Sequence, residues 1–170
     1  MGTLIDIPQD NNEVAKVVGA NVFNFDTGRR DYVINGYTVS FNPTDADFIT
    51  KFNATLKRLG AAQERFQAEM KDAGEDADKT TAALEGYCAT GRTLFDDLFG
   101  EGASDGVFNG CSPFAVQADT RLALWVVLCD YLADVIGDAI LELPDEIKTD
   151  SLRANGAKSK AILAKYKVNR

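Results

Sequence analysis

The chain has 170 residues, no histidine, and 26 acidic against 18 basic side chains, for a formal net charge of -8. This length indicates one domain, because domains typically hold about 100 to 200 residues. The acidic balance argues against nucleic acid as a partner, since binding to a phosphate backbone needs a clustered basic surface. The longest apolar run, Leu122 to Cys129, has eight residues, far short of the roughly 20 that span a bilayer. We therefore expect a folded protein without a membrane segment.

The amino-terminal residues carry little regular pattern. Residues 1–21 have no sustained hydrophobic period and are predicted to form an N-terminal arm. They lack the basic and apolar regions of a signal peptide, so we expect the protein to stay in the cytoplasm. Residues 22–25 alternate apolar and polar side chains, and residues 27–30 are expected to turn the chain.

The clearest local signal is a β-hairpin. Asn35-Gly36 separates two runs of β-prone residues within residues 32–41. Both turn residues tolerate a positive φ, so this dipeptide predicts a two-residue type I′ turn. Val39 and Phe41 then share one face of the second strand.

A long helix is predicted after the hairpin. Thr44 is expected to cap it, and the helix should end near Lys71. Its apolar positions step by three and four residues, with Gln63 as the single polar member. This stripe is interpreted either as a seam inside one chain or as an intermolecular helix pair in which Gln63 sets the register. Its members are Ile49, Phe52, Leu56, Leu59, Gln63, Phe66 and Met70.

A second helix is predicted from about Lys79 to Phe99, after a solvated acidic connection at residues 72–78. Gly86 and Gly91 each weaken it by up to about 1 kcal/mol relative to Ala, unless they let another element approach closely. The face predicted to be apolar holds Leu84, Tyr87, Cys88, Leu94, Phe95 and Leu98.

Residues 100–110 form a glycine-punctuated loop by prediction. They match no phosphate-binding pattern and follow a helix instead of a strand. Gly100 is expected to cap the preceding helix, and Val107 and Phe108 to fold back on the core. A third helix should begin near Pro113 or Asp119, run to about Ile140, and be the most buried element, with Trp125 as core.

The last segment changes in charge. The first 150 residues carry a net charge of -14, whereas residues 151–170 carry +6 and no acidic side chain. This basic tail is expected to rest on the acidic surface of its own chain, and the alternatives are a docking arm for an acidic partner or a weak nucleic-acid contact. Its basic residues are Arg153, Lys158, Lys160, Lys165, Lys167 and Arg170.

The chemistry-bearing residues do not indicate an enzyme. General acid–base catalysis most often uses histidine, which is absent, and the adjacent Asp96 and Asp97 point to different helix faces. Cys88, Cys111 and Cys129 have no metal-binding or redox spacing and are expected to be reduced thiols in the core. We expect no metal and no cofactor.

Three stretches together resemble a known family. They are residues 41–48 at the start of the long helix, residues 95–108 with the sequence FDDLFGEGASDGVF, and residues 165–170. The middle stretch carries most of the similarity. The chain resembles the tail assembly chaperones of long-tailed phages and prophages of Gram-positive bacteria.

This resemblance implies a non-catalytic, self-associating protein in the cytoplasm of the bacterial host cell. It would bind the phage tape-measure protein, keep its apolar helices from aggregating, help to recruit tail-tube subunits, and be absent from the mature virion. Holding helices requires apolar grooves rimmed by charge. Core packing is the favoured interpretation of the candidate contact residues, which are Phe52, Leu59, Phe66, Met70, Val107 and Phe108.

Two other functions remain open. One is a structural virion or adaptor protein in which the hairpin or the N-terminal arm adds a strand to a neighbour. The other is a small regulatory or host-interaction protein that uses its basic tail.

For the fold, we predict the α+β class: a small antiparallel N-terminal sheet packed on three main helices, with a further C-terminal helix. The predicted organisation is an arm at residues 1–21, one globular domain at residues 22–143, and a basic helix or tail at residues 144–170.

Overall fold

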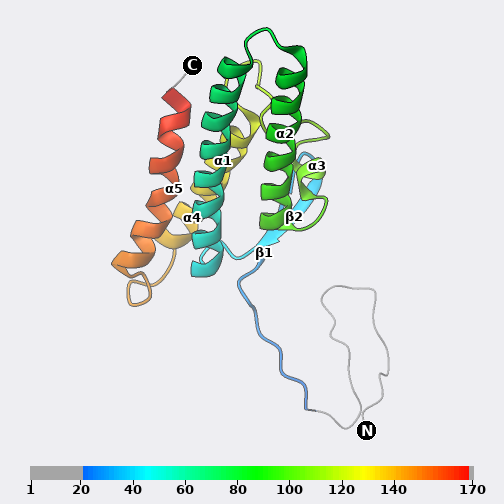
Figure 1. Cartoon of the computed structure of the whole chain (residues 1–170). Helices are drawn as coiled ribbons and strands as arrows, with labels where there is room; N and C mark the ends of the chain where they lie inside the picture. The colour runs from blue at the N-terminus through cyan, green and yellow to red at the C-terminus, as the bar shows by residue number, and fades with distance from the viewer. Residues whose placement is uncertain (1–20, 169–170) are drawn as a thin grey trace.

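A computed structural model describes residues 21–168 (Figure 1). Within them, an antiparallel hairpin is followed by helices, which confirms the α+β class and the small N-terminal sheet. Arg170 and the predicted arm, except for its last residue, lie outside the described residues. The elements are β1 (Arg30–Ile34), β2 (Tyr37–Phe41), α1 (Ala46–Ala73), α2 (Ala77–Phe99), α3 (Ala103–Val107), α4 (Leu124–Leu141) and α5 (Asp150–Val168).

The hairpin forms as predicted. Ile34 pairs with Tyr37 across the two-residue turn, and Asn35 and Gly36 have φ values of 50° and 80°. Positive φ at both positions is what a type I′ turn requires. Val39 and Phe41 share the inner face and are buried, so this face closes one end of the helical bundle.

The cap of α1 differs from the prediction. Asp45, not Thr44, is the N-cap residue, and its carboxylate accepts a hydrogen bond from the backbone N–H of Asp47. The hydroxyl and the backbone N–H of Thr44 both donate instead to Asn42 Oδ1, each over 2.9 Å. The helix also runs slightly past the predicted end, to Ala73.

α1 is the central helix. It lies between α2 and α5, with α4 behind it in the view of Figure 1. Ile49, Phe52, Leu56 and Leu59 have no exposed surface. Gln63 Oε1 accepts a hydrogen bond from the indole N–H of Trp125 over 3.3 Å. The predicted stripe is therefore a seam inside one chain, and its polar member satisfies a buried tryptophan of α4.

α2 begins two residues earlier than predicted, because Asp76 caps it through the backbone N–H groups of Asp78 and Lys79. Leu94 and Phe95 are buried as expected. Leu84 was predicted on the same face but is not part of the core, since its side chain is 44% exposed. It lies near the α1–α2 connection, where no other described element covers it.

The segment after α2 is more ordered than predicted. Gly100 ends α2 with a φ of 114°, and its N–H donates to Asp96 O, as expected. The predicted loop, however, contains the short helix α3. Val107 and Phe108 fold back on the core and are buried, which confirms that part of the prediction.

α4 starts at Leu124, later than the sequence indicated. Residues 113–123 instead form an irregular segment closed by a bridge between Val116 and Ala123. Trp125, Leu132 and Ile136 have no exposed surface. The predicted burial of this helix and of its tryptophan is confirmed.

The basic C-terminal segment is a helix that rests on acidic residues of its own chain. α5 packs against α1 and α4. Lys160 Nζ lies 2.9 Å from Asp130 and 2.6 Å from Asp134, and Lys167 Nζ lies 3.2 Å from Asp130. Lys165 pairs with Glu64 of α1. The charge asymmetry along the sequence is thus partly neutralised within the fold.

A buried polar link also holds α5. The amide of Asn53 on α1 donates to Asn155 O over 3.0 Å, and its oxygen accepts from the hydroxyl of Ser159 over 2.7 Å. Both Asn53 and Ser159 are buried. Replacing Asn53 leaves these partners unsatisfied away from water.

We expect Asn53→Ala to lower the free energy of unfolding by about 1–3 kcal/mol, because a buried group that loses its partner keeps its desolvation cost. Urea denaturation measures the change. In a double-mutant cycle, Ser159→Ala should cost less in the Asn53→Ala background than in the wild type. Strictly additive effects would contradict the link.

The ion pairs of α5 predict an acid-sensitive contribution to stability. Burial tends to raise the pKa of Asp130, but the hydrogen bonds and charges of Lys160 and Lys167 outweigh it, so the pKa lies below its ordinary value of 3.8. The unfolded state therefore binds this proton at a higher pH than the folded state. The stabilisation is present above about pH 4 and is lost as the pH falls through the folded-state pKa.

At pH 7 we expect Asp130→Asn to cost about 1 kcal/mol, and the difference from the wild type should shrink at acidic pH. Urea denaturation across the pH range checks this. Asp138→Asn removes the same charge from α4 and is the control, since no ion pair to Asp138 is seen within residues 21–168. Equal effects of the two substitutions would refute the prediction.

Candidate functional site

The structure buries most of the residues predicted to contact a partner. Phe52 and Leu59 have no exposed surface, and Val107 and Phe108 are 1% and 4% exposed. These four side chains are core in this fold, because the stripe on α1 is already covered by other helices of the same chain. Phe66 and Met70 are half-buried, and Phe66 lies at a surface groove.

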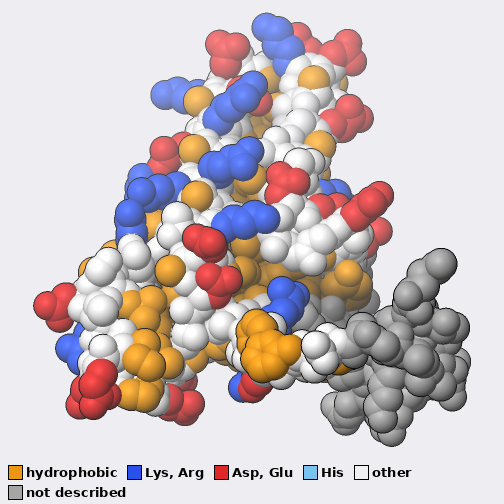
Figure 2. All heavy atoms as spheres, turned by 90° about the horizontal axis from the view of Figure 1, so that it is seen from below, with side chains coloured by type: hydrophobic (Ala, Val, Ile, Leu, Met, Phe, Trp, Pro, Cys, Tyr) orange, Lys and Arg blue, Asp and Glu red, His pale blue; other side chains and the backbone are white. Residues whose placement is uncertain are grey.

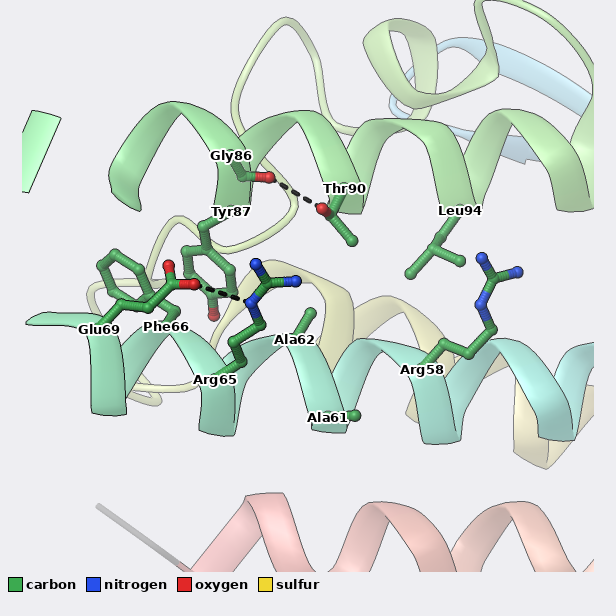
Figure 3. Close-up of a pocket in the computed structure, with 10 residues that line it drawn as sticks. All are labelled: Arg58, Ala61, Ala62, Arg65, Phe66, Glu69, Gly86, Tyr87, Thr90 and Leu94. Carbon is green, nitrogen blue, oxygen red and sulfur yellow. Dashed lines mark hydrogen bonds and ion pairs between the residues drawn. The ribbon is translucent and has the colours of Figure 1, made fainter. Parts of the chain in front are cut away.

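This groove runs between α1 and α2, and its cavity volume is about 330 Å³ (Figure 3). Small residues line much of it: Ala61 and Ala62 from α1, and Gly86 and Thr90 from α2. Leu94 closes one end, and the stacked rings of Phe66 and Tyr87, with centroids 4.1 Å apart, close the other. A helix can approach such a wall of small side chains closely. We call it the α1–α2 groove.

Two arginines border the α1–α2 groove. Arg58 and Arg65 are seven residues apart on α1, which corresponds to about 10 Å along the helix. Arg65 Nε donates to Glu69 over 2.7 Å, and the side chain remains 81% exposed. Arg58 is exposed, and within residues 21–168 no ion pair to its guanidinium is seen. The groove therefore offers an apolar floor and, on one rim, the charge of Arg58 beside the Arg65–Glu69 ion pair.

The glycines of α2 have different roles. A Cβ on Gly91 would lie 2.7 Å from Cε2 of Phe114, so this glycine makes room for an aromatic side chain of the segment before α4. The sequence could only indicate that some element approaches here. A Cβ on Gly86 would meet no atom within 4 Å, so Gly86 leaves an open space in the wall of the groove.

The stretch at residues 95–108 fastens the hairpin to the bundle. Asp96 accepts a hydrogen bond from the N–H of Ser104 over 2.8 Å, and Arg92 pairs with Asp105 over the same distance. Asn35 of the hairpin turn donates to Val107 O over 2.7 Å. This stretch therefore has a structural role in the fold, and the Asp96 carboxylate is used to hold α3.

The cysteines agree with the prediction in being free thiols, but only one of the three lies in the core. Cys129 is buried, and burial raises the pKa of its thiol well above the ordinary value. Cys88 is half-buried and Cys111 is exposed, because the latter lies in the irregular segment after α3. All three are free thiols. In the part of the chain that the structure describes, no group of His, Cys, Asp or Glu side chains could hold a metal ion.

The fold is that of a small helical α+β protein with a surface groove between α1 and α2. Within residues 21–168, no helix is both long and apolar enough to cross a membrane. Residues 35–121, just over half of the chain, match a protein family described as a family of unknown function, DUF6673, and the chain belongs to it. The match extends from the hairpin turn to the segment before α4. No curated protein and no solved structure matches the chain.

The two glycines give a matched prediction. Gly86→Ala should raise the free energy of unfolding by up to about 1 kcal/mol, because Ala has the higher helix propensity and the site is open. Gly91→Ala has the same propensity gain but forces Phe114 to move, and overpacking costs about 1–3 kcal/mol. Thermal and urea unfolding should place Gly91→Ala below Gly86→Ala in stability. The reverse order would contradict the assigned contacts.

Proposed function

We propose that this protein is a non-catalytic phage tail assembly chaperone that binds helical segments of the tape-measure protein and helps to recruit tail-tube subunits. The observation that carries the proposal is the α1–α2 groove, in which small side chains lie beside two exposed arginines. The resemblance of residues 41–48, 95–108 and 165–170 to such chaperones adds the identity of the partner.

The ligand that fits the groove is an amphipathic helix. Its narrow apolar face would lie against Ala61, Ala62 and the open space at Gly86. Carboxylates seven residues apart on the ligand would match the spacing of Arg58 and Arg65. An apolar helix held in this way is shielded from aggregation, which is the task of a chaperone for a long helical protein.

Charge supports the same role. The net charge of -8 keeps the protein soluble while it presents apolar surface. Several basic side chains of α5 are already engaged with acidic residues of α1 and α4. Arg65 is likewise paired with Glu69, whereas no ion pair to Arg58 is seen within residues 21–168. Arg58 is therefore better placed to receive an acidic group of a ligand than the paired lysines of the basic tail are.

Binding to the tape-measure protein tests the proposal. We expect Gly86→Leu to weaken binding at least about tenfold, since the added side chain occupies the groove. The double variant Arg58→Glu and Arg65→Glu should weaken it by at least as much. Isothermal titration with tape-measure segments made as peptides, or co-purification after co-expression, measures the change.

Arg153→Glu with Lys158→Glu is the charge-matched control, because it changes the net charge equally on α5. This variant should bind normally. Loss of binding in the control alone would instead support an interaction through the basic tail. Normal binding by both groove variants would overturn the proposed site.

Location separates a chaperone from a structural virion or adaptor protein. We expect the protein to be abundant in the lysate of cells that produce the phage and nearly absent from purified particles. Mass spectrometry, normalised to the tail-tube protein, measures both amounts. A fixed copy number in particles would exclude the chaperone function and favour a structural subunit.

A further inference from the structure

The segment before β1 carries an exposed aromatic pair. Phe23 and Phe25 are 84% and 70% exposed, and their ring centroids lie 5.7 Å apart. Residues two apart in an extended chain share a face, so both rings project from the same side. Val22, on the other side, is 51% exposed. Figure 2 shows hydrophobic side chains on the chain that leaves the body, and two neighbouring exposed rings are costly for a protein to leave in water.

The base of this segment is fixed to the fold. Asn42 donates from its side chain to Thr27 O over 3.0 Å, and the guanidinium of Arg29 donates to Ser40 O over 2.6 Å. Asp26 accepts hydrogen bonds from Gly28 N–H and from the side chain of Arg30. These bonds direct residues 22–25 away from the body, as Figure 1 shows.

The outer edge of β1 has backbone hydrogen-bonding groups that β2 does not use. The Ile34–Tyr37 pair flanks a two-residue turn and is therefore hydrogen-bonded, so the next residue, Val33, turns its backbone N–H and C=O away from β2. The same alternation applies to Asp31. No backbone hydrogen bond from another described segment reaches either residue. The outer edge of β1 is thus available for another strand.

An apolar groove lies beside this edge. Its cavity volume is about 390 Å³, and it is lined from β1 and α4 by Val33, Leu124, Val127 and Tyr131, among others. Val33 is 69% exposed and Tyr131 is 48% exposed. A strand added to β1 would place alternate side chains in this groove. We call the free edge and this groove the β1 acceptor.

We propose that residues 22–25 of one copy of this chain add as a strand to the β1 acceptor of a second copy, with Phe23 and Phe25 in the groove beside α4. Each chain holds one donor segment and one acceptor, so reciprocal exchange closes a two-fold dimer without leaving either unpaired.

The second copy is the occupant because the donor segment does not reach its own acceptor. Thr27 and Arg29 are tied to Asn42 and Ser40, at the end of β2, and the chain departs from there. To fold back onto β1 of the same chain, the chain would have to reverse within residues 26–29, where these bonds hold it along the end of β2. An identical chain supplies a donor segment without that reversal.

Sedimentation equilibrium of the full chain tests the proposal. The wild type should show a reversible monomer–dimer equilibrium. The double variant Phe23→Ser and Phe25→Ser should move the transition to at least about tenfold higher concentration, because it removes the apolar anchors. Ile147→Ser changes an apolar residue that is 57% exposed, far from the donor in sequence, and should leave the equilibrium unchanged.

Val33→Pro tests the acceptor. Proline removes an N–H that does not bond to β2, so the hairpin keeps its hydrogen bonds while an added strand loses one. Circular dichroism and thermal unfolding verify that this variant folds. If it does not fold, the Phe23→Ser and Phe25→Ser variant still tests the proposal. Each variant alone should be monomeric at the concentration where the wild type is dimeric.

Mixing the two variants gives the decisive result. The Val33→Pro chain retains a donor and the Phe23→Ser, Phe25→Ser chain retains an acceptor, so a mixed pair keeps one of the two exchanges. A heterodimer should therefore form in the mixture, at a higher concentration than the wild-type dimer requires. A wild type that is monomeric at every concentration would overturn the proposal. A dimer that survives the donor substitutions unchanged would also overturn it.

Discussion

The structure depends on how α1 is covered. This helix has neighbours on several sides, yet its apolar stripe is narrow, so the remaining contacts must be polar and still satisfied. Asn53 bonds to α5, Gln63 accepts from Trp125 of α4, and Glu64 pairs with Lys165. The contacts of Asn53 and Gln63 let a helix with one apolar face pack within a bundle, because polar groups buried with partners avoid most of the desolvation cost. The Glu64–Lys165 pair is exposed to solvent and adds little to stability.

As a consequence, the most hydrophobic face of α1 is buried against other segments of its own chain. What remains for a ligand is the outer side of the α1–α2 pair, where Ala61, Ala62, Gly86 and Thr90 are small. The space beside Gly86 is open, because no atom lies within 4 Å of where its Cβ would be. The space beside Gly91, further along the same helix, is occupied by the ring of Phe114. The proposed helix-binding surface therefore relies on close approach of the two backbones and on charge at the rim, and not on large exposed side chains.

The stretch at residues 95–108 relates the two proposed surfaces. It holds the hairpin against α2 and α3 through Asn35, Asp96 and Ser104, and Val107 and Phe108 contribute to the wall of the β1 acceptor. The α1–α2 groove and the β1 acceptor are formed by different residues. A dimer formed at the β1 acceptor could therefore present two α1–α2 grooves to a long helical ligand.

The sequence by itself determined the local features of this protein. Asn35-Gly36 specifies its turn through φ, the spacing of Ile49, Phe52, Leu56 and Leu59 specifies a helix with one buried face, and Gly100 ends α2. These depend on residues near one another in the chain. Only the tertiary structure decided which apolar residues are accessible: Phe52, Leu59, Val107 and Phe108 are covered by distant segments, whereas Leu84, Phe23 and Phe25 are not. The tertiary structure likewise decided that Gly86 borders open space while Gly91 contacts Phe114, and which carboxylates pair with the basic tail. Burial and charge pairing depend on contacts between residues up to about a hundred positions apart, and no local sequence pattern records such contacts.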